Sequence, residues 1–112
     1  VNSDNEVTIQ TVSHTATGAS VLIFASFKAV PSSGRSHSVT ARVKRSGSTI
    51  FTQTLTGVGE THFFSFSLTD FSASAGSVTY TLTAENNGTS PQAAATTSTV
   101  SSRSLALLEV KK

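Results

Sequence analysis

Short segments in which apolar and polar residues alternate follow one another along the whole chain. In 37–45, for example, Val39, Ala41 and Val43 alternate with polar neighbours, and the same period recurs in 77–85. A period of two is that of a β-strand with one buried face, whereas a helix repeats after about 3.6 residues. Clusters of Gly, Pro, Asn and Ser interrupt the segments roughly every 10 to 14 residues, a spacing typical of antiparallel sandwiches and barrels.

The composition favours the same fold class. The chain has 112 residues, among them 20 serines and 18 threonines, and charged residues make up only 12%. Threonine suits a half-buried pleated surface, and serine competes with helical hydrogen bonding. A chain of this length is large enough for one domain with a single core. We therefore expect residues 1–112 to form one all-β domain.

The segments predict eight strands, at 7–12, 19–30, 37–45, 48–56, 61–69, 77–85, 92–100 and 102–110. In the first of them Val7, Ile9 and Thr11 alternate with polar residues, and Ser46-Gly47 fits a tight hairpin turn. The strand count favours an eight-stranded antiparallel jelly-roll-like β-sandwich. An immunoglobulin-like sandwich is the alternative, although the sequence lacks the Cys and Trp pattern of antibody domains.

Two segments, 19–30 and 102–110, are apolar on both faces. If these strands are neighbours, their outer faces form an apolar surface too large to leave in water. Either a loop or attached domain covers it, or the chain associates with copies of itself; the short loops favour association. The residues expected at the interface between copies are Leu22, Phe24, Leu105, Leu107 and Glu109.

Glu109 needs a partner if it lies in such an interface, because burying a lone carboxylate is costly. The candidates are Arg103, Lys111 and a basic side chain of a neighbouring subunit. The other interpretation places Glu109 at the open rim of the sheet, where water solvates it.

The end of the chain resembles a known group of proteins. The segment SVTYTLTAEN followed by a polar stretch and SRSLALLEVKK is similar to the endings of small β domains on tailed-bacteriophage virions. Their arrangement is that of the trimeric jelly rolls of the tumour necrosis factor and complement-head type. The matching residues are Val78, Tyr80, Leu82, Arg103, Ser104, Leu105, Leu108, Glu109 and Lys111. The resemblance covers roughly the last 35 residues. It rests on a pattern of hydrophobic residues with a few charged residues between them, which is a motif of low to moderate specificity.

This resemblance implies a homotrimeric, non-enzymatic protein of the virion surface. It implies a final strand at the centre of the subunit and beside the threefold axis. It implies partners among capsid or tail proteins, in a head-decoration role or in a tail-fibre or tail-tip attachment role. The shaft that usually attaches a fibre head is missing from the sequence, so both roles stay open.

Basic residues concentrate in one region, at Arg35, Arg42, Lys44 and Arg45. They are candidates for contact with an acidic partner surface, or they keep a solvated sheet face charged. A net charge of +2 is too small to predict nucleic acid as the main partner. Polar loop residues, Asn87 and Gln92 among them, are candidates for binding a host surface glycan. A bacterial or extracellular glycan-binding module is accordingly the alternative function.

The sequence predicts no enzyme. The chain has no Cys, and its three histidines lie in different segments without a recognisable nucleophile motif. Glu60 and His62 could converge on a metal ion, but this pair alone is weak, and we expect no metal and no other cofactor. No apolar run is long enough to span a membrane. The resemblance implies the virion surface as the location, and the alternative function implies the extracellular space.

Overall fold

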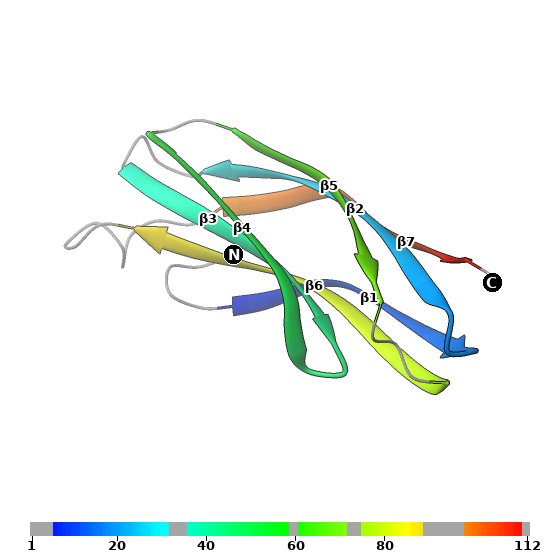
Figure 1. Ribbon diagram of the computed structural model, residues 1–112. Helices are drawn as coiled ribbons and strands as arrows, with labels where there is room; N and C mark the ends of the chain where they lie inside the picture. Colours follow the sequence, from blue (N-terminus) through cyan, green and yellow to red (C-terminus); the bar gives the residue numbers. More distant parts are fainter. Residues whose placement is uncertain (1–5, 32–35, 59–60, 72–74, 89–97, 111–112) are drawn as a thin grey trace.

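The computed structural model describes residues 6–31, 36–58, 61–71, 75–88 and 98–110. They form two antiparallel sheets, with strand orders β1-β6-β3-β4 and β5-β2-β7, that face each other as a sandwich (Figure 1). The predicted all-β sandwich is confirmed, with seven strands in the described residues instead of eight. The strands are β1 Glu6–Ala16, β2 Ser20–Pro31, β3 Ser36–Arg45, β4 Ser48–Val58, β5 His62–Asp70, β6 Gly76–Gly88 and β7 Ser98–Val110.

The prediction of two separate strands at the end of the chain was wrong for the described residues. One strand, β7, runs from Ser98 to Val110 along β2, and residues 92–97 lie outside the described part. The alternation is broken by a bulge, because Ser26 lies opposite Ser104 while Lys28 lies opposite Ser101. An extra residue in one strand interrupts its period without ending the strand.

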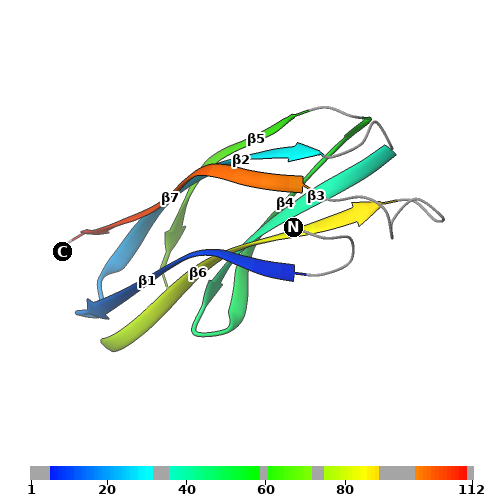
Figure 2. The ribbon, with the colours of Figure 1, turned by 180° about the vertical axis from the view of Figure 1, so that it is seen from behind.

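Within the described residues, every step along the chain except the β3–β4 hairpin leads from one sheet to the other. The first strand pairs with the sixth, whereas the immunoglobulin fold pairs its first strand with its second. In this pairing the strand order differs from that of an antibody domain. Among the described strands, the final strand β7 lies at an edge of its sheet, beside β2 (Figure 2).

The core lies between the two sheets and is built from the inward positions that the alternation predicted. Val39, Ala41 and Val43 of β3 are fully buried, and so are Tyr80 and Leu82 of β6. The sheet β5-β2-β7 contributes Val21, Ile23, Phe27, Phe64 and Leu105 to the same core. Each large apolar side chain removed from water in this way contributes about 1.5–3 kcal/mol to folding.

The turn and register of two strands follow from local backbone geometry. Ser46 and Gly47 both have positive φ, 46° and 91°, as a two-residue type I′ hairpin turn requires. In β1 the pairing with β6 shifts between Thr8 and Gln10, so that Val12 packs on the core. Thr11, which continued the predicted alternation, is exposed instead.

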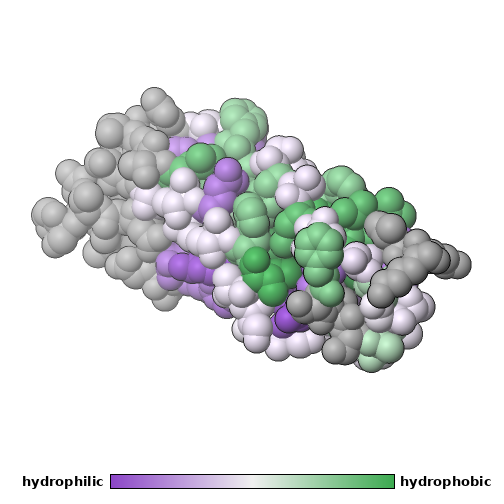
Figure 3. Space-filling view, in the orientation of Figure 1, coloured by the Kyte–Doolittle hydropathy of each residue, from purple (hydrophilic) through white to green (hydrophobic). Residues whose placement is uncertain are grey.

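The two sheets are joined differently along their two sides. On one side Phe51 of β4 stacks on Phe66 of β5, with ring centroids 4.5 Å apart. The neighbouring Ile50, Leu55 and Leu68 are only partly buried, and apolar surface gathers in the middle and on the right of this side of the molecule (Figure 3). On the other side β7 lies near β1, and the guanidinium of Arg103 donates a hydrogen bond to the Ile9 carbonyl oxygen at 3.3 Å.

Candidate functional site

The outer face of the three-stranded sheet carries an exposed apolar area. Leu22 of β2 lies opposite Leu108 of β7, and Phe24 lies opposite Ala106, so the four side chains are neighbours on one face. Phe24 is 46% exposed and Leu108 56% exposed. We call Leu22, Phe24, Ala106 and Leu108 the apolar strip. Two neighbouring strands that are apolar on both faces were predicted, and the structure brings them together.

The predicted interface residues do not all lie on this face. Leu105 lies opposite Ala25 and is buried in the core, and Leu107 lies opposite Ile23 and packs against the core. Alternation tells which residues of a strand share a face, but only the neighbouring strand decides which face is turned inward. Of the predicted set, Leu22 and Phe24 remain on the outer face, and association through that face remains a prediction.

Glu109 has partners within its own chain. Its Oε1 atom accepts hydrogen bonds from the backbone N–H and from the hydroxyl of Thr17, both at 2.7 Å. Its Oε2 atom lies 3.5 Å from Nε2 of His14. The two hydrogen bonds from Thr17 and the nearby imidazole hold the pKa of Glu109 below its ordinary value. The carboxylate thus fastens the end of β7 to the turn between β1 and β2 (Figure 2).

The expected partners of Glu109 are placed elsewhere or not described. Arg103 contacts Ile9, and Lys111 lies outside the described residues. The grouping of Thr17, Glu109 and His14 also lacks the order of a catalytic triad. In a triad the imidazole lies between the nucleophile and the acid, whereas here the carboxylate lies between the hydroxyl and the imidazole.

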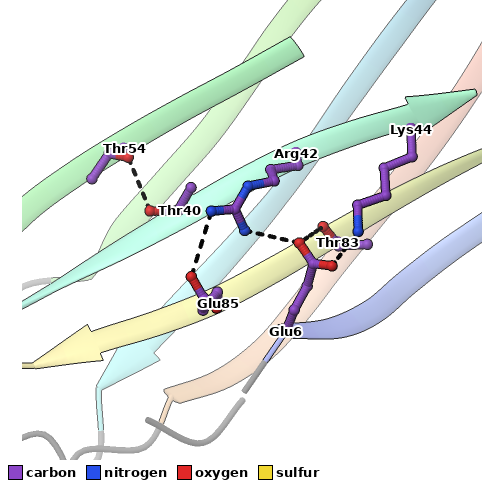
Figure 4. A network of polar contacts seen from close by, with 7 residues as sticks. All are labelled: Glu6, Thr40, Arg42, Lys44, Thr54, Thr83 and Glu85. Carbon is purple, nitrogen blue, oxygen red and sulfur yellow. Dashed lines mark hydrogen bonds and ion pairs between the residues drawn. The ribbon is translucent and has the colours of Figure 1, made fainter. Parts of the chain in front are cut away.

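The outer face of the four-stranded sheet carries a network of charges (Figure 4). Arg42 of β3 donates to Oε2 of Glu6 at 2.8 Å, and its other terminal nitrogen lies 3.5 Å from Oε1 of Glu85. Lys44 pairs with Oε1 of Glu6, and the hydroxyl of Thr83 donates to the same carboxylate at 3.1 Å. The ammonium of Lys44, followed by the other donors, lowers the pKa of Glu6.

This network changes the interpretation of the predicted basic surface. Arg42 and Lys44 lie together as expected, but the carboxylates of Glu6 and Glu85 lie beside them. Two positive charges meet two negative charges, so the area offers little net field to an acidic partner. The structure shows a sheet face whose charges are paired with one another, and binding of an acidic partner to it stays a prediction.

Arg45 belongs to a different contact, one that joins the two sheets. Its guanidinium pairs with Oδ1 of Asp70, and the hydroxyl of Tyr80 donates to Oδ2 of the same carboxylate at 2.8 Å. Asp70 and Tyr80 are both buried. Burial and the hydrogen bond to Asp70 raise the pKa of Tyr80. We call these three residues the Asp70 cluster.

The Asp70 cluster could have been found in the sequence. The inward positions Phe64, Phe66 and Leu68 continue with the same period to position 70. An inward tyrosine usually needs a partner for its hydroxyl, and an inward carboxylate needs a donor. The alternation therefore contained the signal, although it did not tell which strand supplies Tyr80's partner.

Several other predicted residues give no site in this structure. Arg35, Glu60 and Gln92 lie outside the described residues; Asn87 pairs through its backbone with Ser38, and its side chain is not described. His62 is buried at the start of β5. In the part of the chain that the structure describes, no group of three or more His, Cys, Asp or Glu side chains could hold a metal ion. The same ranges contain no helix long and apolar enough to cross a membrane.

Comparison with known proteins adds no family. No protein-family model matches the chain, and no curated protein matches it significantly.

Proposed function

We propose that this protein is a non-enzymatic structural and binding domain that associates with copies of itself through the apolar strip. The observation that carries the proposal is the exposure of Phe24 and Leu108 as neighbours on two paired strands. Burying such side chains against another copy removes apolar area from water at about 25 cal/mol per Å². A closed symmetric oligomer is the usual result of such self-association.

The proposed setting is the surface of a tailed-phage virion, and the proposed oligomer is a trimer. Both come from the resemblance of the closing segment to small virion β domains. The sandwich fold agrees with this setting without being specific to it, because sandwiches serve many functions. In a head-decoration role the domain would contact capsid proteins, and in a fibre or tip role it would contact tail proteins and the host.

Sedimentation equilibrium of the purified chain tests the association. The expected mass is three times the 11.6 kDa of one chain. Leu108→Asp places a charge in each copy of the contact and should give single chains that keep the wild-type circular dichroism spectrum. Phe71→Asp is the matched control, since Phe71 is 80% exposed and does not belong to the strip. A wild-type chain that sediments as a monomer at all concentrations would refute self-association.

Localisation on particles tests the setting separately. Gold-labelled antibodies against the chain should decorate the heads or the tail tips of phage particles. Labelling at one of these places distinguishes the two roles. A chain that is trimeric but labels no particle would leave the association standing and refute the virion setting.

A further inference from the structure

A second feature of the outer face of β5-β2-β7 adjoins the apolar strip and shares Phe24 with it. Two hollows of about 330 Å³ and 320 Å³ adjoin each other there, and both are open to solvent. They share Ser26 and Ser65, so they form one continuous trough. Ser67 and Ser104 line one half together with Phe24, and Lys28 lines the other half together with Phe63.

The strand register arranges the lining residues in a regular way. Ser26 lies opposite Ser65 on one side and opposite Ser104 on the other, so three hydroxyls from three strands stand in a row across the sheet. Neighbouring strands are about 4.8 Å apart. Ser67, opposite Phe24, adds a fourth hydroxyl beside this row.

An exposed aromatic ring stands at each end of the trough. Phe63 is 70% exposed and Phe24 46% exposed. Phe63 lies opposite Lys28, four positions along β2 from Phe24, so the two rings are separated by roughly 13 Å along the strands.

This combination of groups suits one class of ligand. Serine hydroxyls both donate and accept hydrogen bonds and carry no charge, and an exposed ring offers a flat apolar face. A sugar ring presents hydroxyls at its rim and C–H groups on its faces, so it complements both. Lys28 is the one charged side chain among the lining residues, which does not favour a strongly charged polymer.

We propose that the trough between Phe24 and Phe63 binds a neutral oligosaccharide, with sugar rings stacked on the two phenylalanines and hydrogen-bonded to the serines. The separation of the rings calls for a chain of sugars rather than a single one. A second copy of the protein fits the trough less well, because it would bury four hydroxyls that then need new partners. The inference does not require self-association. Phe24 belongs to the apolar strip as well, so a sugar on its ring and another copy packed against it compete for the same surface, whereas Phe63 and Ser65 lie outside the strip.

The first experiment screens the intact wild-type chain on an array of neutral glucan, galactan and chitin oligosaccharides. For the oligosaccharide that binds best, a titration of the ¹⁵N-labelled chain should shift the amide signals of Ser26, Ser65 and Ser104. Absence of binding to any of these oligosaccharides at millimolar concentration would overturn the proposal. Signal changes confined to another surface would overturn it as well.

Variants then test the two kinds of contact by calorimetry. Phe63→Ala and Ser65→Ala should each weaken binding, Phe63→Ala by roughly tenfold. Phe71→Ala, which removes an exposed ring outside the trough, should bind as the wild type does. Equal binding by Phe63→Ala and wild type would contradict the role of the ring.

The native mass separates this proposal from the proposed self-association. Phe63→Ala should leave the sedimentation mass unchanged, whereas Leu108→Asp should lower it. If Phe63→Ala lowers the mass, another copy of the chain occupies the trough and the oligosaccharide proposal fails. If the wild-type chain and Leu108→Asp are both monomers and sugars still bind at the trough, self-association fails and the oligosaccharide proposal stands.

Discussion

Tyr80→Phe is the sharpest test of how the two sheets are held together. The change removes one buried hydroxyl that donates to Asp70 at 2.8 Å, and it leaves the ring in the core. A hydrogen bond to a charged group contributes about 1.5–3 kcal/mol. The free energy of unfolding should therefore fall by about 2 kcal/mol, a substantial part of the 5–15 kcal/mol that is usual for a domain.

Urea unfolding and thermal unfolding measure this loss. For a domain of this size, about 2 kcal/mol corresponds to a melting temperature lower by roughly 8 °C. Thr54→Val is the matched control, because it removes the neutral hydrogen bond between the Thr40 and Thr54 hydroxyls, 2.9 Å long and only partly buried. It should cost clearly less, about 1 kcal/mol or below. A Tyr80→Phe variant as stable as the wild type would refute the argument.

The same hydroxyl gives a prediction for alkaline pH. The chain has one Tyr and no Trp, so its absorbance near 295 nm reports Tyr80 alone. Since the pKa of Tyr80 is raised in the folded state, the tyrosinate signal should appear above the ordinary value of about 10. The protonated hydroxyl of Tyr80 contributes fully to stability below pH about 10, and this contribution is lost as the pH rises from there through the pKa of Tyr80 in the folded state. Ionisation of the folded protein at the ordinary pKa would contradict the hydrogen bond.

Two further changes probe the outer polar contacts. Glu109→Gln should lower stability at neutral pH, and this loss should fade as pH falls through the depressed pKa of Glu109, below the usual value of about 4.3. Urea unfolding at pH 7 and pH 3 measures the loss. A loss of stability that does not depend on pH would be evidence against the contact with Thr17. Combining Arg42→Glu with Lys44→Glu sets four carboxylates side by side. The free energy of unfolding should fall by about 1–2 kcal/mol at low salt and by less at high salt. A loss of stability that is the same at both salt concentrations would contradict this account.

The alternation of residues was enough to predict most of the core. Val39, Ala41 and Val43 are inward because a period of two leaves a strand with one apolar face only one way to meet the other sheet. Ser46-Gly47 was predictable because few residue pairs accept positive φ at both turn positions. These features depend on neighbours in the sequence, and so they can be recognised there.

What could not be predicted depends on residues far apart in the chain. The bulge in β7 exists only relative to β2, and it made one strand look like two. Glu109 finds its donors at Thr17, 92 positions away, and Arg42 finds Glu6 across the intervening strand β6. Pairing of this kind is set by the sheet topology, which alternation does not specify.

The two outer faces of the sandwich differ in how readily they can meet a partner. On the four-stranded sheet, Arg42 and Lys44 are already paired with Glu6, so a partner would have to displace these contacts or desolvate them at a cost. On the three-stranded sheet, the apolar strip and the serine trough carry no such pairs among the interactions of the described residues, and Lys28 is their one charge. Removing water from uncharged groups costs far less than removing it from ions. This difference in desolvation is the reason to look for partners on β5-β2-β7, whether they are copies of the chain or sugars.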